Sequence, residues 1–235
     1  MHKLAASILL ALSLGIFTPA AAATITGTVR QGAPDPPRRK VLMFAQDQCN
    51  AYNMKHPHYV QDVVANNHRL QYVFVYVKSG SGLQASYPPP PPVSINQQHC
   101  WYDPHAVALM VGQKLQIVNS DENVTHNIRM LCSLNAPRDF KQAGPLAGQQ
   151  PTEIDTSFDK PEIFYAMCNI HHWMHAVIGV FSNPYYAVTD GNGNFTIPGL
   201  PAGTYQLEAW QEKYGTKTMT VTVSADENKT VEFDY

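Results

Sequence analysis

The stretch that decides the fold is Met167-Cys168-Asn169-Ile170-His171-His172-Trp173-Met174. It contains a Cys-x2-His-x2-Met pattern, so three soft or borderline ligands fall within seven residues. A thiolate, an imidazole and a thioether suit copper far better than calcium or magnesium, which prefer oxygen ligands. The stretch stands where one apolar segment ends and another begins. It therefore predicts a metal-binding turn between two strands.

This turn lacks one ligand, because the electron-transfer copper arrangement combines one Cys and two His with a weak axial Met. His126 completes the set, since it follows the turn at residues 119–123 and lies in the segment 124–131, which favours a strand. The sequence thus predicts that His126, Cys168, His171 and Met174 bind one copper ion, which cycles between Cu(I) and Cu(II).

Two alternatives compete with copper at these positions. Zinc binds Cys and His well, although Met is a poor zinc ligand. A disulfide between Cys168 and Cys132 is the second alternative. If residues 124–132 form one strand, Cys132 points to the same face as His126, so its thiol approaches the site.

The composition of the chain favours strands over helices, because charged residues make up only 14% while Val, Thr, Gly, Pro and aromatics are plentiful. Apolar alternation and turn signals predict short strands along the whole chain. They lie at residues 25–30, 72–77, 106–111, 115–119, 124–131, 162–167, 176–181, 205–210, 216–223 and 230–233. No helix longer than a turn or two is expected. Short strands at this spacing are typical of an all-β sandwich.

The first 23 residues have the pattern of an export signal. Met1-His2-Lys3 precedes an apolar stretch at residues 4–17, and Ala21 and Ala23 frame an Ala-x-Ala cleavage site before Thr24. The apolar stretch is too short to span a bilayer comfortably. We therefore expect a cleaved signal peptide, no membrane span in the mature chain, and a periplasmic or secreted location. The 16 basic and 18 acidic residues include no basic run, which argues against a nucleic-acid partner.

Four cysteines in an exported chain predict two disulfides by default. The neighbours of Cys168 suit a metal thiolate better, which leaves three cysteines and at most one bridge within the chain. We favour Cys49 with Cys100, and the other pairings stay open.

The motifs around the ligands resemble a cupredoxin, and the short ligand turn is most similar to that of amicyanin. The resemblance rests on Asp103-Pro104, Val111-Gly112-Gln113, Asn119-Ser120-Asp121 and His126-Asn127, followed by Cys168, His171 and Met174. Residues 98–105 and 210–215 resemble exported bacterial proteins labelled methylamine-utilisation or plastocyanin-like. The sequence departs from that pattern at His172, where Pro is expected, and at Gln211, where His is expected.

The cupredoxin resemblance implies a Greek-key β-sandwich and a role for each residue of the site. His126 and His171 would bind through ring nitrogens, Cys168 as a thiolate and Met174 as a long axial contact. Asn127 would hold the Cys loop by hydrogen bonds and donate towards the Cys sulfur. The edge of His171 would be the electron port at the surface, with His172 and Trp173 beside it for docking. Burial of Trp173 in the core is an equal alternative.

The C-terminal residues resemble the second half of a carboxypeptidase regulatory-like, transthyretin-like β-sandwich. Residues 190–197 and 200–205 carry this resemblance, and residues 25–29 and 74–77 fit the first half of the same pattern. After the signal at residues 1–23, we expect a copper domain at residues 93–183, inserted into a host sandwich formed by residues 24–92 and 184–235. A separate C-terminal domain that follows an enlarged cupredoxin is the alternative.

The resemblance implies single-electron transfer with a redox protein such as a periplasmic cytochrome or oxidoreductase. A copper carrier or sensor is an alternative that the surplus His105, His172 and His175 favour, and an envelope binding module without redox turnover is another. An enzyme is not expected, because copper oxidases and nitrite reductases need a second copper centre with several more histidines. Only residues 56–58, His-Pro-His, offer that spacing.

Overall fold

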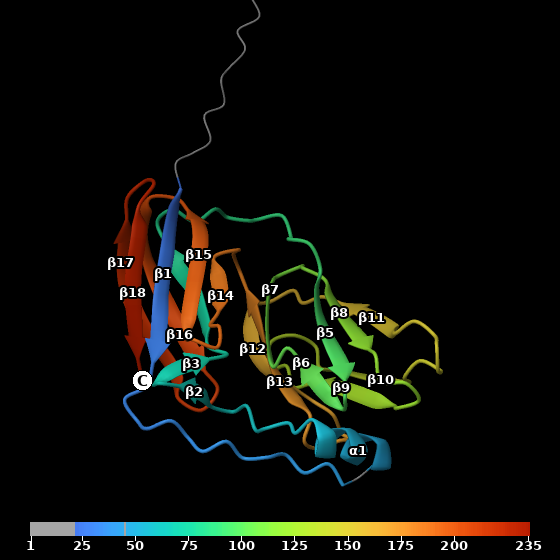
Figure 1. Cartoon of the computed structure of the whole chain (residues 1–235). Helices are drawn as coiled ribbons and strands as arrows, with labels where there is room; N and C mark the ends of the chain where they lie inside the picture. The colour runs from blue at the N-terminus through green and yellow to red at the C-terminus, as the bar shows by residue number, and fades with distance from the viewer. Residues whose placement is uncertain (1–21, 45) are drawn as a thin grey trace, which may run out of the picture.

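The computed structural model describes residues 22–44 and 46–235 (Figure 1). Residues 1–21 of the expected signal peptide lie outside the described part of the chain. Among the described residues, no helix is long and apolar enough to cross a membrane.

The predicted all-β fold is confirmed, because the described residues form eighteen strands and a single helix. The strands are β1 (Ala23–Arg30), β2 (Val64–Asn66), β3 (Arg69–Gln71), β4 (Phe74–Gly80), β5 (Val93–Gln98), β6 (Trp101–Asp103), β7 (Ala106–Met110), β8 (Leu115–Asn119), β9 (His126–Met130), β10 (Arg138–Gln142), β11 (Thr152–Thr156), β12 (Glu162–Met167), β13 (His175–Phe181), β14 (Tyr186–Val188), β15 (Asn194–Leu200), β16 (Gly203–Gln211), β17 (Gly215–Val223) and β18 (Asn228–Asp234). The helix is α1 (Asp47–Lys55).

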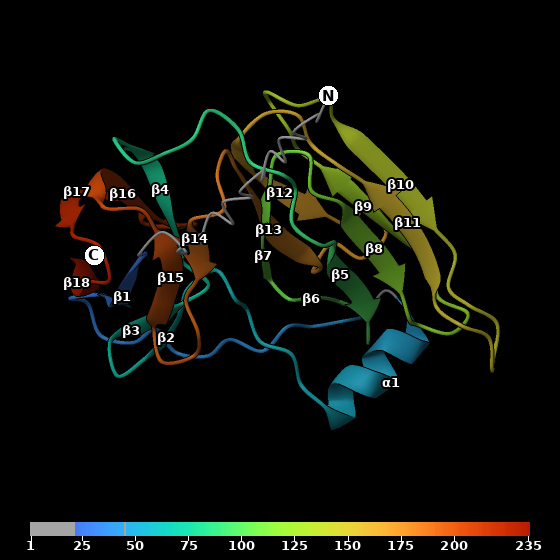
Figure 2. The ribbon, with the colours of Figure 1, turned by 90° about the horizontal axis from the view of Figure 1, so that it is seen from above.

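The strands form four sheets that pair into two sandwiches, seen side by side in Figure 2. In the first sandwich, a sheet of order β15-β1-β3-β2, with β18 parallel to β1, lies beside a sheet of order β14-β4-β16-β17. In the second, a sheet of order β10-β9-β12-β13-β7 lies beside one of order β11-β8-β5-β6. The second sandwich is continuous in sequence and interrupts the first between β4 and β14.

Each sandwich has its own apolar core, and a third cluster joins them. In the joining cluster, Phe74 of β4 lies with Ala106 of β7 and with Val177 and Phe181 of β13. The burial of β7 and β13 does not alternate, because both strands are buried on both faces rather than one. The sheet that contains β7, β12 and β13 therefore packs against the first sandwich.

Helix α1 departs from the expectation that no helix exceeds a turn or two, since it runs for nine residues. Its sequence position falls within the expected host segment 24–92, yet Val41, Met43 and Cys49 lie in the core of the second sandwich. Both views place α1 against that sandwich, away from β1–β3 (Figures 1 and 2). The segment between β1 and β2 thus crosses from the first sandwich to the second. The expected division assigned all of residues 24–92 to the first sandwich and did not foresee this crossing.

Candidate metal centre

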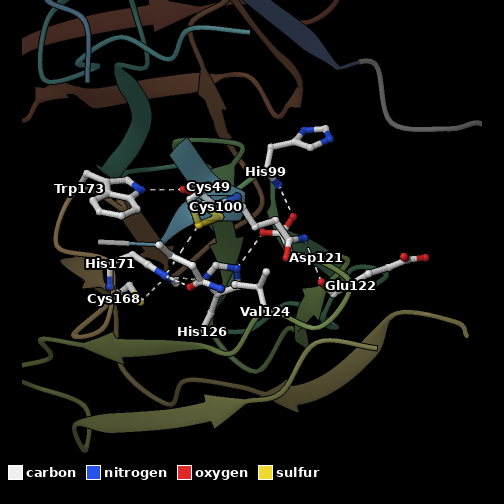
Figure 3. Close-up of a disulfide and its surroundings, with 12 residues drawn as sticks. Cys49, His99, Cys100, Asp121, Glu122, Val124, His126, Cys168, His171 and Trp173 are labelled. Atoms are coloured by element: carbon white, nitrogen blue, oxygen red, sulfur yellow. Dashed lines mark hydrogen bonds and ion pairs between the residues drawn. A yellow bond between two sulfur atoms is a disulfide. The ribbon is translucent and has the colours of Figure 1, made fainter. Parts of the chain in front are cut away.

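Three donor atoms from two separate segments meet inside the second sandwich (Figure 3). His126 is the first residue of β9, Cys168 follows β12, and His171 lies in the turn before β13. The Nδ1 atoms of His126 and His171 are 2.9 Å apart, and Cys168 Sγ is 3.9 Å from His171 Nδ1. None of the three side chains reaches solvent, because all are buried at 1% exposure or less.

The turn that carries Cys168, His171 and Met174 is closed by its own backbone. The strands β12 and β13 pair with Met167 opposite His175, which leaves residues 168–174 as the connecting turn. Within it the Cys168 N–H donates to the Met174 carbonyl at 3.1 Å, and the Met174 N–H donates to the His171 carbonyl at 2.9 Å. Met174 is wholly buried in the same core as Cys168. The spacing seen in the sequence therefore corresponds to one compact turn.

Asp121 orients the ring of His126, a role that the sequence analysis did not assign. Its Oδ2 lies 2.8 Å from His126 Nε2 and accepts the Cys100 N–H at 2.7 Å, while its Oδ1 accepts the His99 N–H at 2.5 Å. A carboxylate only accepts here, so Nε2 is a donor and the Nδ1 edge is turned towards Cys168 and His171. Burial tends to raise the pKa of Asp121, but these hydrogen bonds outweigh it and lower the pKa.

The surroundings of Cys168 favour the thiolate. Burial by itself would raise the pKa of the thiol, but hydrogen bonds from His126 and His171 and from the backbone N–H groups of Asn127 and His171 lower it to about 5. The same thiolate and Asp121 raise the pKa of His126, against the lowering effect of burial. Cys168 is thus a thiolate at neutral pH, and the thiolate is the form that binds metals.

Asn127 holds the ligand turn as the resemblance implies, and its side-chain oxygen faces that turn. Its Nδ2 donates to Asp139 Oδ1 at 2.7 Å, and its Oδ1 accepts the Asn169 N–H at 2.7 Å. The oxygen also lies 3.4 Å from Cys168 Sγ as an acceptor. The side chain does not donate to the sulfur, because Asp139 accepts from its NH2 group, and the expected donation comes from the backbone N–H of Asn127 instead.

The expectation that His171 reaches the surface is also wrong, because the residue is only 1% exposed. Its Nε2 lies 2.8 Å from Gln46 Oε1 and 3.9 Å from Cys49 Sγ, so the segment leading into α1 covers the edge of the ring. Figure 3 shows the Cys49–Cys100 pair beside His171. Gln46 precedes His171 by 125 positions, and no local pattern in the sequence signals the contact.

Trp173 packs beside His171 and is itself only partly buried. Its ring centroid is 5.1 Å from that of His171, and its Nε1 donates to the Cys100 carbonyl at 3.0 Å. The side chain is partly buried against the core, whereas His172 is exposed. Trp173 therefore packs against the core with part of its side chain and leaves the rest exposed, so neither docking nor burial alone describes it.

The structure joins Cys49 to Cys100 by a disulfide, which is the pairing that the sequence favours. Cys132 and Cys168 are both free and buried, so the alternative bridge between them is not formed. Cys100, Asp121 and His126 also converge as a possible ligand group. The disulfide leaves Cys100 without a free thiol, so Cys100 cannot bind a metal there.

Five other histidines lie in two groups outside the His126, Cys168 and His171 donor set. The ring of His99 stacks on Tyr52 with centroids 3.8 Å apart, and His56 and His58 lie near the same tyrosine. The pattern His56-Pro57-His58 therefore contributes to an aromatic cluster, and within the described residues it belongs to none of the converging ligand groups. His105 and His175 converge with Glu212 at a different place.

The fold and the site together define an all-β protein of two sandwiches, one of which holds a buried His-Cys-His donor set. A family model of the carboxypeptidase regulatory-like domain matches residues 175–235, which contain β13–β18. No match is found among curated proteins.

Solved structures of copper proteins are similar to part of the chain. A Cu-containing nitrite reductase from Thermus scotoductus SA-01 shares 19% identity over 45% of this chain and 26% of its own, with a TM-score of 0.34. This chain thus spans about a quarter of that reductase. A Cu(I) form of an amicyanin variant shares 15% identity over 38% of this chain and 81% of its own, with a TM-score of 0.31. Another reduced amicyanin variant shares 13% identity over 45% and 97%, also with a TM-score of 0.31.

Proposed function

We propose that this chain binds one copper ion through His126, Cys168, His171 and Met174 and carries single electrons between redox proteins of the periplasm. The observation that supports the proposal is the convergence of His126 Nδ1, His171 Nδ1 and Cys168 Sγ, three side chains buried from solvent. Two imidazoles, a thiolate and a buried methionine are a donor set suited to copper in both oxidation states. Copper, when bound, supplies the one-electron couple.

Neighbouring side chains orient the proposed ligands by hydrogen bonds. Asp121 fixes the ring of His126, Gln46 fixes that of His171, and Asn127 ties the turn through Asn169. Ligands that are held by neighbouring hydrogen bonds move little when the charge on the metal changes. Low reorganisation is what an electron carrier requires, and we assign no catalytic step to the chain.

We place partner docking at Trp173 and His172. Met167 and Ile170 are apolar residues of the same turn region with 38% and 40% exposure, so the surface of this turn region is partly apolar. Apolar contact at the centre of a surface patch is the usual basis of protein docking. A cytochrome or a periplasmic oxidoreductase that docks here would reach the centre through the Trp173 ring, because α1 covers the direct route to His171.

The copper proposal is tested by adding Cu(II) to the purified mature protein and recording its visible spectrum. We expect an intense band from thiolate-to-copper charge transfer, and we expect Cys168→Ser to abolish it. The matched control is Cys132→Ser, which changes the other buried free thiol and should keep the band. A fully Cu(II)-loaded protein without colour would contradict the proposal.

The electron-transfer role is tested with Trp173→Ala and stopped-flow reduction by a small cytochrome c as the probe. We expect slower electron exchange with unchanged colour and copper affinity, because the large apolar contact is lost while the ligands remain. His172→Ala, which removes an exposed ring without a bonding partner, should have a smaller effect. Reversible copper release without electron exchange in every variant would favour a copper carrier instead.

A further inference from the structure

A second group of metal-ligating side chains lies where the two sandwiches meet. His105 precedes β7 and His175 begins β13, so both come from the second sandwich. Glu212 follows β16 and Asp62 precedes β2, so both come from the first. The two histidines are brought together by the parallel pairing of β7 with β13, in which Ala106 is opposite Val177.

The distances within this group are close to those that a metal ion needs. His105 Nε2 lies 2.8 Å from Glu212 Oε2, and His175 Nε2 lies 3.2 Å from Asp62 Oδ1 and 3.9 Å from Glu212 Oε1. One ligand atom from each of His105, His175 and Glu212 lies within 4.8 Å of the others. Neighbouring ligand atoms of a tetrahedral zinc ion are roughly 3.4 Å apart, so only small movements separate the group from that geometry.

Within the group, Glu212 has no permanent cation beside it. The Glu212 side chain is only 5% exposed, and its ion-pair partners among the described residues are the two histidines. The nearby ammonium, Lys213, pairs with Asp62 at 3.2 Å instead. A buried carboxylate without a permanent cation is costly. A divalent ion would supply the positive charge that Glu212 lacks.

His105 is a fully buried imidazole with one unpartnered nitrogen. Its side chain is 0% exposed, and its Nδ1 has no hydrogen-bond partner. Its Nε2 makes the polar contact with Glu212 at 2.8 Å. The position of this imidazole is therefore explained by the group at Glu212 and by packing, such as the Tyr72 ring at 5.1 Å.

The group has a route to solvent and a rigid support. Asp62 and Lys213 line a cleft of about 730 Å³. The side chains of Asp62 and His175 are 23% and 22% exposed, so an ion can enter from that side. Gln211 donates to the Asp62 carbonyl at 2.7 Å and accepts the Lys213 N–H at 2.6 Å. It therefore ties Asp62 to the turn that carries Glu212.

We propose that His105, His175, Glu212 and Asp62 form a second metal site, specific for a divalent ion of the zinc type, that bridges the two sandwiches. Two imidazoles and two carboxylates without a thiolate suit zinc and lack the soft donor of the first centre. His175 directly follows Met174, so the two centres are adjacent in the chain while their ligand sets are separate. The inference does not depend on whether copper binds at Cys168.

The test is zinc binding to the copper-loaded mature protein, counted by mass spectrometry of metals after gel filtration. We expect one zinc per chain besides the copper, and at least a tenfold loss of zinc affinity in Glu212→Gln and in Asp62→Asn. The partly exposed Asp62 keeps the test valid if Glu212→Gln fails to fold. His56→Ala is the matched control, since it removes an exposed histidine outside the group. Zinc retained equally by all variants would be surface binding and would overturn the proposal.

A second readout separates this site from zinc in the copper centre. In His126→Ala, which removes a ligand of the first centre, zinc should still raise the melting temperature, because the ion joins the two sandwiches. Co(II) bound in this variant should show no thiolate-to-cobalt charge-transfer band. A strong band of that kind, or a melting temperature that zinc does not change, would place the ion elsewhere and contradict the proposed site.

Discussion

The disulfide between Cys49 and Cys100 holds the α1 segment over His171, and its removal has a predictable cost. Both sulfurs are buried, and the bridge closes a loop with a sequence separation of 51. A bridge that closes a loop of this length lowers the entropy of the unfolded chain, which stabilises the folded protein by about 4 kcal/mol at 25 °C. We therefore expect the double variant Cys49→Ala, Cys100→Ala to lose about this much free energy of unfolding.

Urea unfolding of the metal-free protein, followed by tryptophan fluorescence, measures this loss, because Trp101 and Trp173 lie in or against the core of the second sandwich. Cys132→Ala is the control, since it shortens a buried cysteine that forms no bridge. We expect the control to cost about 1 kcal/mol. If the double variant loses no more than the control, the bridge does not constrain the unfolded chain and the reasoning fails.

The same double variant also tests the cover over His171. Without the bridge, the segment that carries Gln46 is no longer tied beside the ring, so the Nε2 edge should become accessible. We expect faster electron exchange with a small cytochrome c and an unchanged thiolate-to-copper band, because Cys168 is not altered. Exchange at the wild-type rate in a destabilised variant would show that α1 is not the barrier.

Three further changes probe the centre and the second free thiol. Met174→Leu should keep copper, because three strong ligands remain, and should shift the reduction potential in voltammetry; copper loss from the folded variant would contradict this. Asp121→Asn should lower copper affinity about 10- to 100-fold in a chelator competition, since His126 loses its orienting carboxylate, and an unchanged affinity would refute that role. Burial, with Glu162 nearby, raises the pKa of Cys132 to about 11, so the thiol stays protonated at pH 8. Iodoacetamide should therefore label Cys132 far more slowly in the native than in the denatured protein. Equal labelling rates, measured by mass spectrometry, would contradict this prediction.

Local sequence was sufficient for the ligand turn and for most of the central strands. Cys168, His171 and Met174 fall in one turn of seven residues, so their spacing alone brings them together. The strands predicted at 115–119 and 162–167 have the bounds that the structure shows, because alternation of apolar residues records which face of a strand is buried. The short strands β2, β3 and β6 have only three residues each, too few to show a period.

Helix α1 and the contacts that complete the centre were decided by tertiary structure. Only Cys49 and Asn53 of α1 are buried, so the helix has no apolar stripe for a sequence pattern to detect. The side chain of Asn53 ties the helix to the preceding segment, because its Nδ2 donates to the Val41 carbonyl at 2.7 Å. The helix thus depends on contacts outside itself.

The sequence by itself determined which donor atoms are available, because Cys168, His171 and Met174 lie within one turn and their chemistry selects a soft metal. Only the folded chain decided what surrounds them. Gln46 meets His171 across 125 positions, and Glu212 meets His105 across 107. The first pair depends on how the segment before α1 lies on the second sandwich, and the second pair depends on how one sandwich lies against the other. The periodicity of the sequence shows which face of a single strand is buried. It does not show which distant segment of the chain packs against that face.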